Sequence, residues 1–218
     1  MGRSKLPKVT LVSVSSVSPE RNLRALEWCT DLMEFGDCKL ITDKQIESTS
    51  SCIKIEKCRL LGSIDEYSKF MIYELTDYIK TEFALVVQPD GVIINPGSWK
   101  DQFLDFDYIG APWPQGMFTD DKGENIRVGN GGFSLRSKKL LSFFNENEIP
   151  WTQYRGSYNE DGFISMANLD LLRRGGIKFP SPLLAYQFSR EIECPDLGEM
   201  DSFGFHNYRG KNSGYPRF

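Results

Sequence analysis

The spacing of hydrophobic residues along this chain alternates between two periods. Residues 8–15 (KVTLVSVS) alternate between apolar and polar side chains and are rich in β-branched residues, a pattern typical of a β-strand. Residues 83–88 (FALVVQ) form a nearly continuous apolar run, as expected of a strand buried on both faces of a sheet. Residues 39–42 predict a short strand, and residues 53–60 predict either another strand or an irregular segment.

Between these segments, apolar residues recur at the three-to-four-residue spacing of an amphipathic helix. The first helix begins at Pro19, a residue favoured in the first helical turn, and we expect Gly36 to end it. The second helix, over residues 63–79, opens with the capping box of Ser63 and Glu66. Two more helices are predicted over residues 138–144 and 160–174.

Strands that alternate with helices predict an α/β fold, and we expect a single domain spanning residues 1–218. That length is sufficient to bury a large core without disulfides or structural metals. Two segments depart from the pattern. Residues 112–124 are rich in Pro, Gly and Asp and predict a mobile surface loop, whereas residues 127–136 (RVGNGGFSLR) predict a strand interrupted by glycines.

The charge and cysteine content exclude some classes of function. With 26 Lys and Arg against 30 Asp and Glu, the net charge of −4 argues against a nucleic-acid partner held by a global basic field. No apolar run reaches the roughly 18 residues of a transmembrane helix, and no signal peptide is recognisable. The five cysteines are scattered without a CxxC pair, which indicates reduced thiols and a cytoplasmic location.

Asp90 and His206 are candidate metal ligands. Asp90 directly follows the buried strand, at the edge where α/β sheets bind ligands, and its carboxylate suits a divalent cation. A Pro-Asp-Gly turn also favours Asp for backbone reasons alone. His206 is the one histidine of the chain and could join Asp90 only if the tail folds back over the sheet edge.

Two further motifs have both a structural and a functional interpretation. Gly129, Gly131 and Gly132 mark either a bulge or a close approach of the backbone to a ligand. Glu160 and Asp161 either complement the dipole of the helix that they begin or supply a general base. The Asp-x-Asp of Asp105 and Asp107 precedes a strand and is predicted to be structural.

Several segments, in this order, resemble a family of uncharacterised glycosyltransferase-like domains of the GT-A type. The resemblance covers roughly residues 63–208. It is carried by FALVVQPDG (83–91), DYIGAPW (107–113), VGNGGFSLRS (128–137), EDG (160–162), FSRE (188–191) and GFH (204–206). It implies a Rossmann-like fold with a mixed central sheet flanked by helices.

The resemblance also implies positions for a nucleotide-sugar donor. The nucleotide would lie over the end of the first strand, at Ser13, Val14 and Ser15, with Asp43 as a contact to the base or ribose. Gln88 and Asp90 stand where similar enzymes carry Asp-x-Asp, so that one carboxylate is missing. The sugar would meet the glycine-rich segment through Asn130, Gly131, Gly132 and Arg136.

The catalytic chemistry implied by the resemblance needs two sites. Asp90 and His206 would bind Mn²⁺ or Mg²⁺ beside the diphosphate, and Asp161, with Glu160, would supply the base. We therefore expect an inverting glycosyltransferase that uses a UDP- or GDP-sugar and a glycan or glycoprotein acceptor. A nucleotidyltransferase, a sugar-nucleotide hydrolase and a non-catalytic nucleotide-sugar or glycan-binding module remain alternatives.

Overall fold

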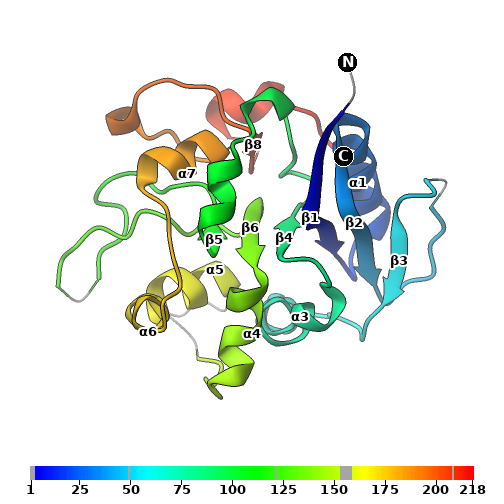
Figure 1. The fold of residues 1–218 in the computed structure, drawn as a ribbon, viewed down its shortest axis with the longest axis horizontal. Helices are drawn as coiled ribbons and strands as arrows, with labels where there is room; N and C mark the ends of the chain where they lie inside the picture. The colour runs from blue at the N-terminus through cyan, green and yellow to red at the C-terminus, as the bar shows by residue number, and fades with distance from the viewer. Residues whose placement is uncertain (1–2, 49, 121, 153–158, 208) are drawn as a thin grey trace.

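The computed structural model describes residues 3–48, 50–120, 122–152, 159–207 and 209–218. Its centre is a six-stranded sheet of order β3-β2-β1-β4-β6-β5 (Figure 1). The pairs β1–β2, β2–β3 and β1–β4 are parallel, whereas β6 runs antiparallel to β4 and β5. The strands are β1 (Ser4–Val14), β2 (Met33–Thr42), β3 (Lys54–Lys57), β4 (Phe83–Val86), β5 (Tyr108–Ile109) and β6 (Ser134–Ser137). This arrangement confirms the predicted mixed α/β sheet.

Helices cover the sheet, and a small second sheet pairs β7 with β8 in parallel. The α-helices and strands outside the main sheet are α1 (Pro19–Leu32), α2 (Ile64–Lys69), α3 (Leu75–Tyr78), α4 (Lys138–Glu146), α5 (Glu160–Gly162), α6 (Leu169–Arg174), α7 (Pro182–Phe188), β7 (Ser189–Arg190) and β8 (Gly204–Phe205). Among the described residues, no helix is long and apolar enough to cross a membrane.

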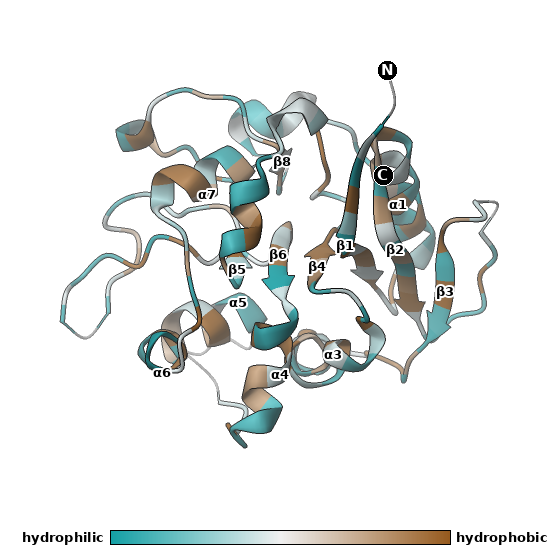
Figure 2. Ribbon diagram, viewed as in Figure 1, coloured by the Kyte–Doolittle hydropathy of each residue, from teal (hydrophilic) through white to brown (hydrophobic). Residues whose placement is uncertain are grey.

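The central strands are apolar because both of their faces are buried. Leu85 of β4 belongs to one cluster of core side chains, whereas its neighbours Ala84 and Val86 belong to another. Leu11 and Val12 of β1 divide between the same two clusters. Figure 2 shows β4 in the hydrophobic colour along its length. The continuous apolar run at 83–88 therefore reflects burial from both sides.

The expectation that Gly36 ends the first helix is wrong. Helix α1 ends at Leu32, and β2 begins at the next residue, so that Gly36 lies inside a strand. A Cβ atom at this position would overlap the carbonyl oxygen of Pro7 on β1. Gly36 is thus required by the close approach of two strands and not by a helix cap.

The predicted helices over 63–79 and 160–174 are both present but irregular. The first contains a π-helical turn at Phe70–Glu74, and the second contains one at Phe163–Ala167. The Ser63 hydroxyl accepts a hydrogen bond from Glu66 N at 3.2 Å, as the capping box predicts. Glu66 Oε2 in turn accepts from Gly62 N, one residue before the cap.

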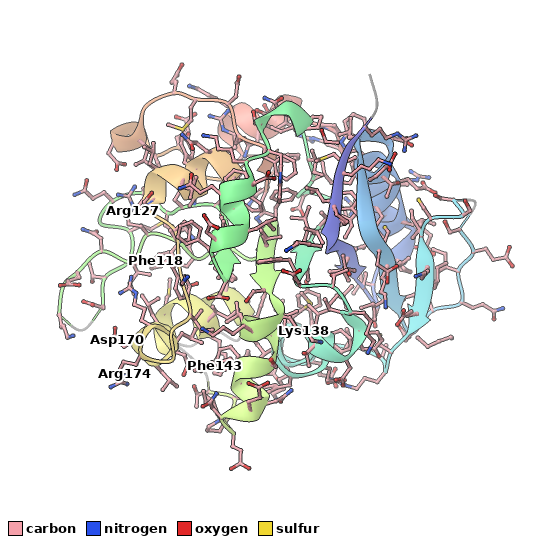
Figure 3. All side chains as sticks on the ribbon, viewed as in Figure 1. Phe118, Arg127, Lys138, Phe143, Asp170 and Arg174 are labelled. Atoms are coloured by element: carbon pink, nitrogen blue, oxygen red, sulfur yellow. The ribbon has the colours of Figure 1, made fainter. Side chains whose placement is uncertain are left out.

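The predicted strand over residues 127–136 is mostly wrong. Only its end, from Ser134, joins the sheet, and Val128 makes an isolated bridge to Pro112. Residues 112–120 and 122–128 belong to an arm in which Trp113 packs edge-on against Phe118. Figure 3 labels Phe118 and Arg127 on this arm. The glycines here serve close packing, since a Cβ at Gly129 would overlap the Trp113 ring.

The Asp-x-Asp at 105–107 is structural, as predicted, because Asp107 joins two segments of backbone. Its Oδ1 accepts a hydrogen bond from Ser137 Oγ at 2.6 Å, and its Oδ2 accepts from Lys178 N at 2.8 Å. The contact with Ser137 anchors the last residue of β6, and the glycine-rich segment precedes the first residue of the same strand.

We predict that Gly110→Ala destabilises the protein by about 1–3 kcal/mol, since a Cβ there would overlap the Asn130 carbonyl oxygen and push the glycine-rich segment outward. Urea unfolding measures the change. Gly97→Ala is the matched control, because its Cβ would meet its nearest neighbour, Asn95 Oδ1, at an ordinary 3.7 Å. Equal stabilities of the two variants would contradict the packing described here.

Candidate active site

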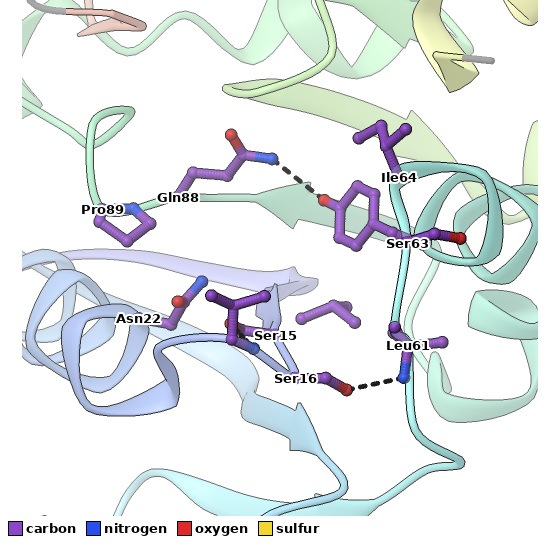
Figure 4. A pocket seen from close by; sticks show the side chains of 12 residues that line it. Ser15, Ser16, Asn22, Leu61, Ser63, Ile64, Gln88 and Pro89 are labelled. Atoms are coloured by element: carbon purple, nitrogen blue, oxygen red, sulfur yellow. Dashed lines mark hydrogen bonds between the residues drawn. The ribbon is translucent and has the colours of Figure 1, made fainter.

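A cavity of about 420 Å³ lies at the carboxyl ends of β1 and β4 (Figure 4). Its walls come from residues 14–17 and 61–64 together with Asn22, Tyr67, Gln88 and Pro89. Among the described residues, none of those that line it is charged, and Val17 and Ile64 expose 86% and 57% of their surface. The cavity therefore suits an uncharged group with an apolar face, and phosphates would need charge from elsewhere.

Two hydrogen bonds shape the cavity walls, and Figure 4 draws both. Leu61 N donates to Ser16 Oγ at 2.9 Å, which joins the loop after β1 to the segment before α2. Gln88 Nε2 donates to the Tyr67 hydroxyl at 3.0 Å. Burial raises the pKa of Tyr67 well above its usual value, so this hydroxyl keeps its proton.

The residues expected at the nucleotide are divided between the cavity and the layer beneath it. Val14, Ser15 and Gln88 line the cavity. Ser13 lies below it, where its hydroxyl donates to Val87 O at 2.6 Å and accepts from Asn22 Nδ2 at 2.7 Å. Asp43 does not line the cavity; its Oδ1 is buried without a hydrogen-bond partner among the described residues.

The structure brings Asp90 and His206 together at the same edge of the sheet. Asp90 sits on the turn after β4, which two backbone hydrogen bonds between Gln88 and Gly91 close. The chain after β8 returns to this turn, because Phe205 N donates to Val92 O and Asn207 N donates to Asp90 O. His206 Nε2 consequently lies 3.8 Å from Asp90 Oδ1.

Glu191 completes this group, although the sequence motif that contains it suggested no role. Its Oε1 lies 3.4 Å from His206 Nδ1, and its Oε2 accepts a hydrogen bond from Asn130 Nδ2 at 2.5 Å. Burial lowers the pKa of His206, but the two carboxylates of Glu191 and Asp90 outweigh it and raise the pKa overall. In the sequence, Glu191 is recognisable only as an acidic residue shortly after helix α7, and this position alone does not predict its contact with His206.

Gly131 and Gly132 separate the histidine from a second group of charged residues. A Cβ at Gly132 would overlap His206 Nε2, and one at Gly131 would lie 2.5 Å from Glu160 Oε1. The imidazole and the acidic residues that begin α5 therefore pack against adjacent residues of one backbone segment. Larger side chains here would force these two groups apart.

Arg136 and Glu160 form a buried ion pair behind the glycines. Arg136 Nη2 lies 2.9 Å from Glu160 Oε1, and the arginine side chain is 1% exposed. Arg136 Nε also donates to Ser134 Oγ at 3.1 Å, and its guanidinium lies 5.8 Å from the centre of the Tyr108 ring. Arg136 is thus held in the core by its ion pair with Glu160.

Asp161 differs from its neighbour because no described cation pairs with it. Its Oδ1 accepts a hydrogen bond from Gly162 N at 2.7 Å. Burial, reinforced by the charge of Glu160, raises the pKa of Asp161 to about 7. A carboxyl group with this pKa can accept a proton near neutral pH, which is the property of a general base.

The residues at the sheet edge are too few to enclose a metal ion by themselves. Among the described residues, no group of three or more His, Cys, Asp or Glu side chains is arranged to bind one. Asp90 and the Nε2 of His206, 3.8 Å apart, could supply two ligands. This pair fits a cation that arrives with further oxygen ligands, such as a diphosphate and water.

A family model matches residues 50–206, which include the sheet edge, the glycines and His206. The chain belongs to the DUF5672 family, described as proteins of unknown function. The family assignment supports the expected relation to uncharacterised domains. No curated protein matches the sequence significantly.

Two solved structures share the fold of this DUF5672 protein. One is a glycosyltransferase involved in the glycosylation of the major capsid of PBCV-1, with a TM-score of 0.52 over 94% of this chain and 95% of that one. The other is the galactosyltransferase LgtC in complex with donor and acceptor sugar analogues, with a TM-score of 0.50 over 93% and 87%. At 14% identity each, they show a GT-A fold for this protein.

We predict that Asp161→Asn stabilises the protein increasingly as the pH rises from about 4 to about 7. The folded protein holds a proton on Asp161 up to a pH of about 7, whereas the unfolded chain loses it near pH 3.8. The folded state binds more protons in this window, so the wild type loses stability as the pH rises and the Asn variant escapes that loss. Melting temperatures across this range, with exposed Asp170→Asn as the control, measure the effect. If the difference in melting temperature between Asp161→Asn and the wild type does not change with pH, the raised pKa of Asp161 is contradicted.

Proposed function

We propose that this protein transfers a sugar from a nucleotide-sugar donor to a hydroxyl group of a glycan or glycoprotein acceptor. The observation that carries the proposal is the arrangement around Gly131 and Gly132. The proposed cation ligands are Asp90 and His206, and the His206 ring packs against Gly132. The proposed base, Asp161, packs beside the adjacent Gly131. Sugar transfer needs both, since the leaving diphosphate needs positive charge and the acceptor needs a base.

The donor proposed is a UDP- or GDP-sugar. The nucleoside would occupy the cavity at the ends of β1 and β4, whose neutral and partly apolar walls suit a base and a ribose. The diphosphate would then extend past Gln88 towards Asp90 and His206. Asp90 and His206 Nε2 would hold Mn²⁺ or Mg²⁺, which would supply positive charge to the leaving diphosphate. The neutral Gln88 and the Tyr67 hydroxyl offer hydrogen bonds where a second carboxylate would repel phosphate.

Asp161 is the proposed base. Glu160 is already paired with Arg136, so its charge is compensated and it is held in place. Asp161 keeps a raised pKa and would take the proton of the acceptor hydroxyl as that oxygen attacks the sugar carbon. A base on the face opposite the leaving diphosphate gives inversion, in which one bond forms as the other breaks.

We predict that the wild type releases nucleoside diphosphate from a UDP- or GDP-sugar when Mn²⁺ and a suitable glycan acceptor are present. The rate should rise through a pH of about 7 and level off above it, because Asp161 must be ionised to accept a proton. Asp161→Asn should lower the rate by about 10²–10⁴-fold, the usual contribution of a general base. The measurement is a coupled assay over a panel of donors and acceptors.

Asp170→Asn, an exposed change on α6, is the control and should retain the wild-type rate. A near-normal rate in Asp161→Asn would remove the proposed role of that residue. Rapid release of free sugar without an acceptor would favour a hydrolase. Binding of sugar nucleotides without turnover across the panel would instead favour a non-catalytic module, consistent with Gln88 in place of a carboxylate.

A further inference from the structure

Glu191 joins three parts of the chain that are distant in sequence. It follows β7 directly, and its carboxylate faces His206, which follows β8, and Asn130 of the glycine-rich segment. Asn207 Nδ2 also donates to Glu191 Oε1, the oxygen that faces His206, at 3.5 Å. Only 12% of the Glu191 side chain is exposed. A carboxylate this buried, with donors around both oxygens, has little freedom to turn elsewhere.

The backbone at Glu191 and at His206 is held in place by contacts that do not involve the Glu191 carboxylate. The parallel pairing of β7 with β8 sets Arg190 opposite Phe205, and His206 N donates to Arg190 O at 2.8 Å. Asn212, which is 2% exposed, directs its Nδ2 towards three carbonyl oxygens. They belong to Glu191 (3.3 Å), His206 (3.2 Å) and Asn207 (3.0 Å). The two side chains therefore meet at a fixed separation.

The two nitrogens of the imidazole face different partners. Nδ1 is buried and directed at Glu191 Oε1, within ion-pair distance but not in hydrogen-bond alignment. Nε2 faces Asp90, whose side chain is 39% exposed and so open to a ligand. A neutral imidazole carries one N–H, and a carboxylate beside a nitrogen favours the proton on that nitrogen. Both nitrogens face a carboxylate, but Glu191 is nearer than Asp90 (3.4 against 3.8 Å) and more deeply buried, so the proton is favoured on Nδ1.

We propose that Glu191 is a positioning residue that holds the proton of His206 on Nδ1 and leaves Nε2 free to act as a ligand. Through Asn130, the same carboxylate fixes the imidazole relative to the glycine-rich segment. Its two oxygens serve two donors, which a glutamine could not do, because one of its terminal atoms is itself a donor. The part of this role that concerns a cation rests on the proposed function, whereas the tautomer of His206 does not.

The single histidine makes the proposal directly measurable. Long-range ¹H–¹⁵N correlation spectra of the full-length, ¹⁵N-labelled protein, without metal or substrate and at alkaline pH, report which nitrogen is protonated. We expect the Nδ1–H tautomer to dominate in the wild type. Glu191→Gln and Glu191→Ala should shift the ratio towards Nε2–H by about tenfold or more, the effect of losing one charge-assisted contact. Glu193→Gln, an exposed change two residues away, should leave the ratio unchanged.

An unchanged tautomer ratio in both Glu191 variants would overturn the proposal, even if they melt at lower temperature, because a purely structural role would lower stability alone. A second measurement separates this result from the proposed function. Affinity for Mn²⁺ in the presence of uridine diphosphate, followed by electron paramagnetic resonance, should fall about 10–100-fold in Glu191→Gln. A shifted tautomer with unchanged Mn²⁺ affinity would support the positioning role and reject His206 as the cation ligand.

Discussion

The candidate site depends on a close approach that only glycine permits. At Gly131 and Gly132 the backbone passes between Glu160 and His206, and a Cβ on either residue would push against one of them. The absence of two side chains thus sets the separation between the proposed cation edge and the proposed base. Gly110 is subject to the same constraint, because a Cβ atom there would overlap the carbonyl oxygen of Asn130.

A buried ion pair then distinguishes two adjacent carboxylates. Burying Arg136 and Glu160 gains little net stability, since the desolvation of both charges offsets most of their attraction. The two acids nevertheless differ: Glu160 pairs directly with Arg136, whereas the half-buried Asp161 has no described cation partner. Loss of hydration, reinforced by the charge of Glu160, raises the pKa of Asp161 to about 7. The arrangement follows the general pattern in which neighbouring acids are given different roles by their surroundings.

Much of the fold could be predicted from local patterns, but the contacts that assemble the site could not. The apolar run at 83–88 predicted the buried strand β4, and its end located Asp90 at the sheet edge. Whether the tail returns to Asp90 depends on the two-residue pairing of β7 with β8, which has no periodic signal. Gly36 is required where β2 passes β1, and Glu191 meets His206 across the β7–β8 pair. Both contacts join segments that are distant in sequence, and a local pattern of residues does not record such packing.

The central claim is that the cavity at the ends of β1 and β4 holds a nucleoside while Asp90 and His206 hold the cation of its diphosphate. A crystal grown with uridine diphosphate and Mn²⁺, with anomalous diffraction collected at the manganese absorption edge, tests it most directly. The account predicts an anomalous peak bound by the Asp90 carboxylate and His206 Nε2, with the nucleoside lying between Val14 and Tyr67. A nucleotide bound elsewhere, or a manganese peak remote from both residues, would contradict it.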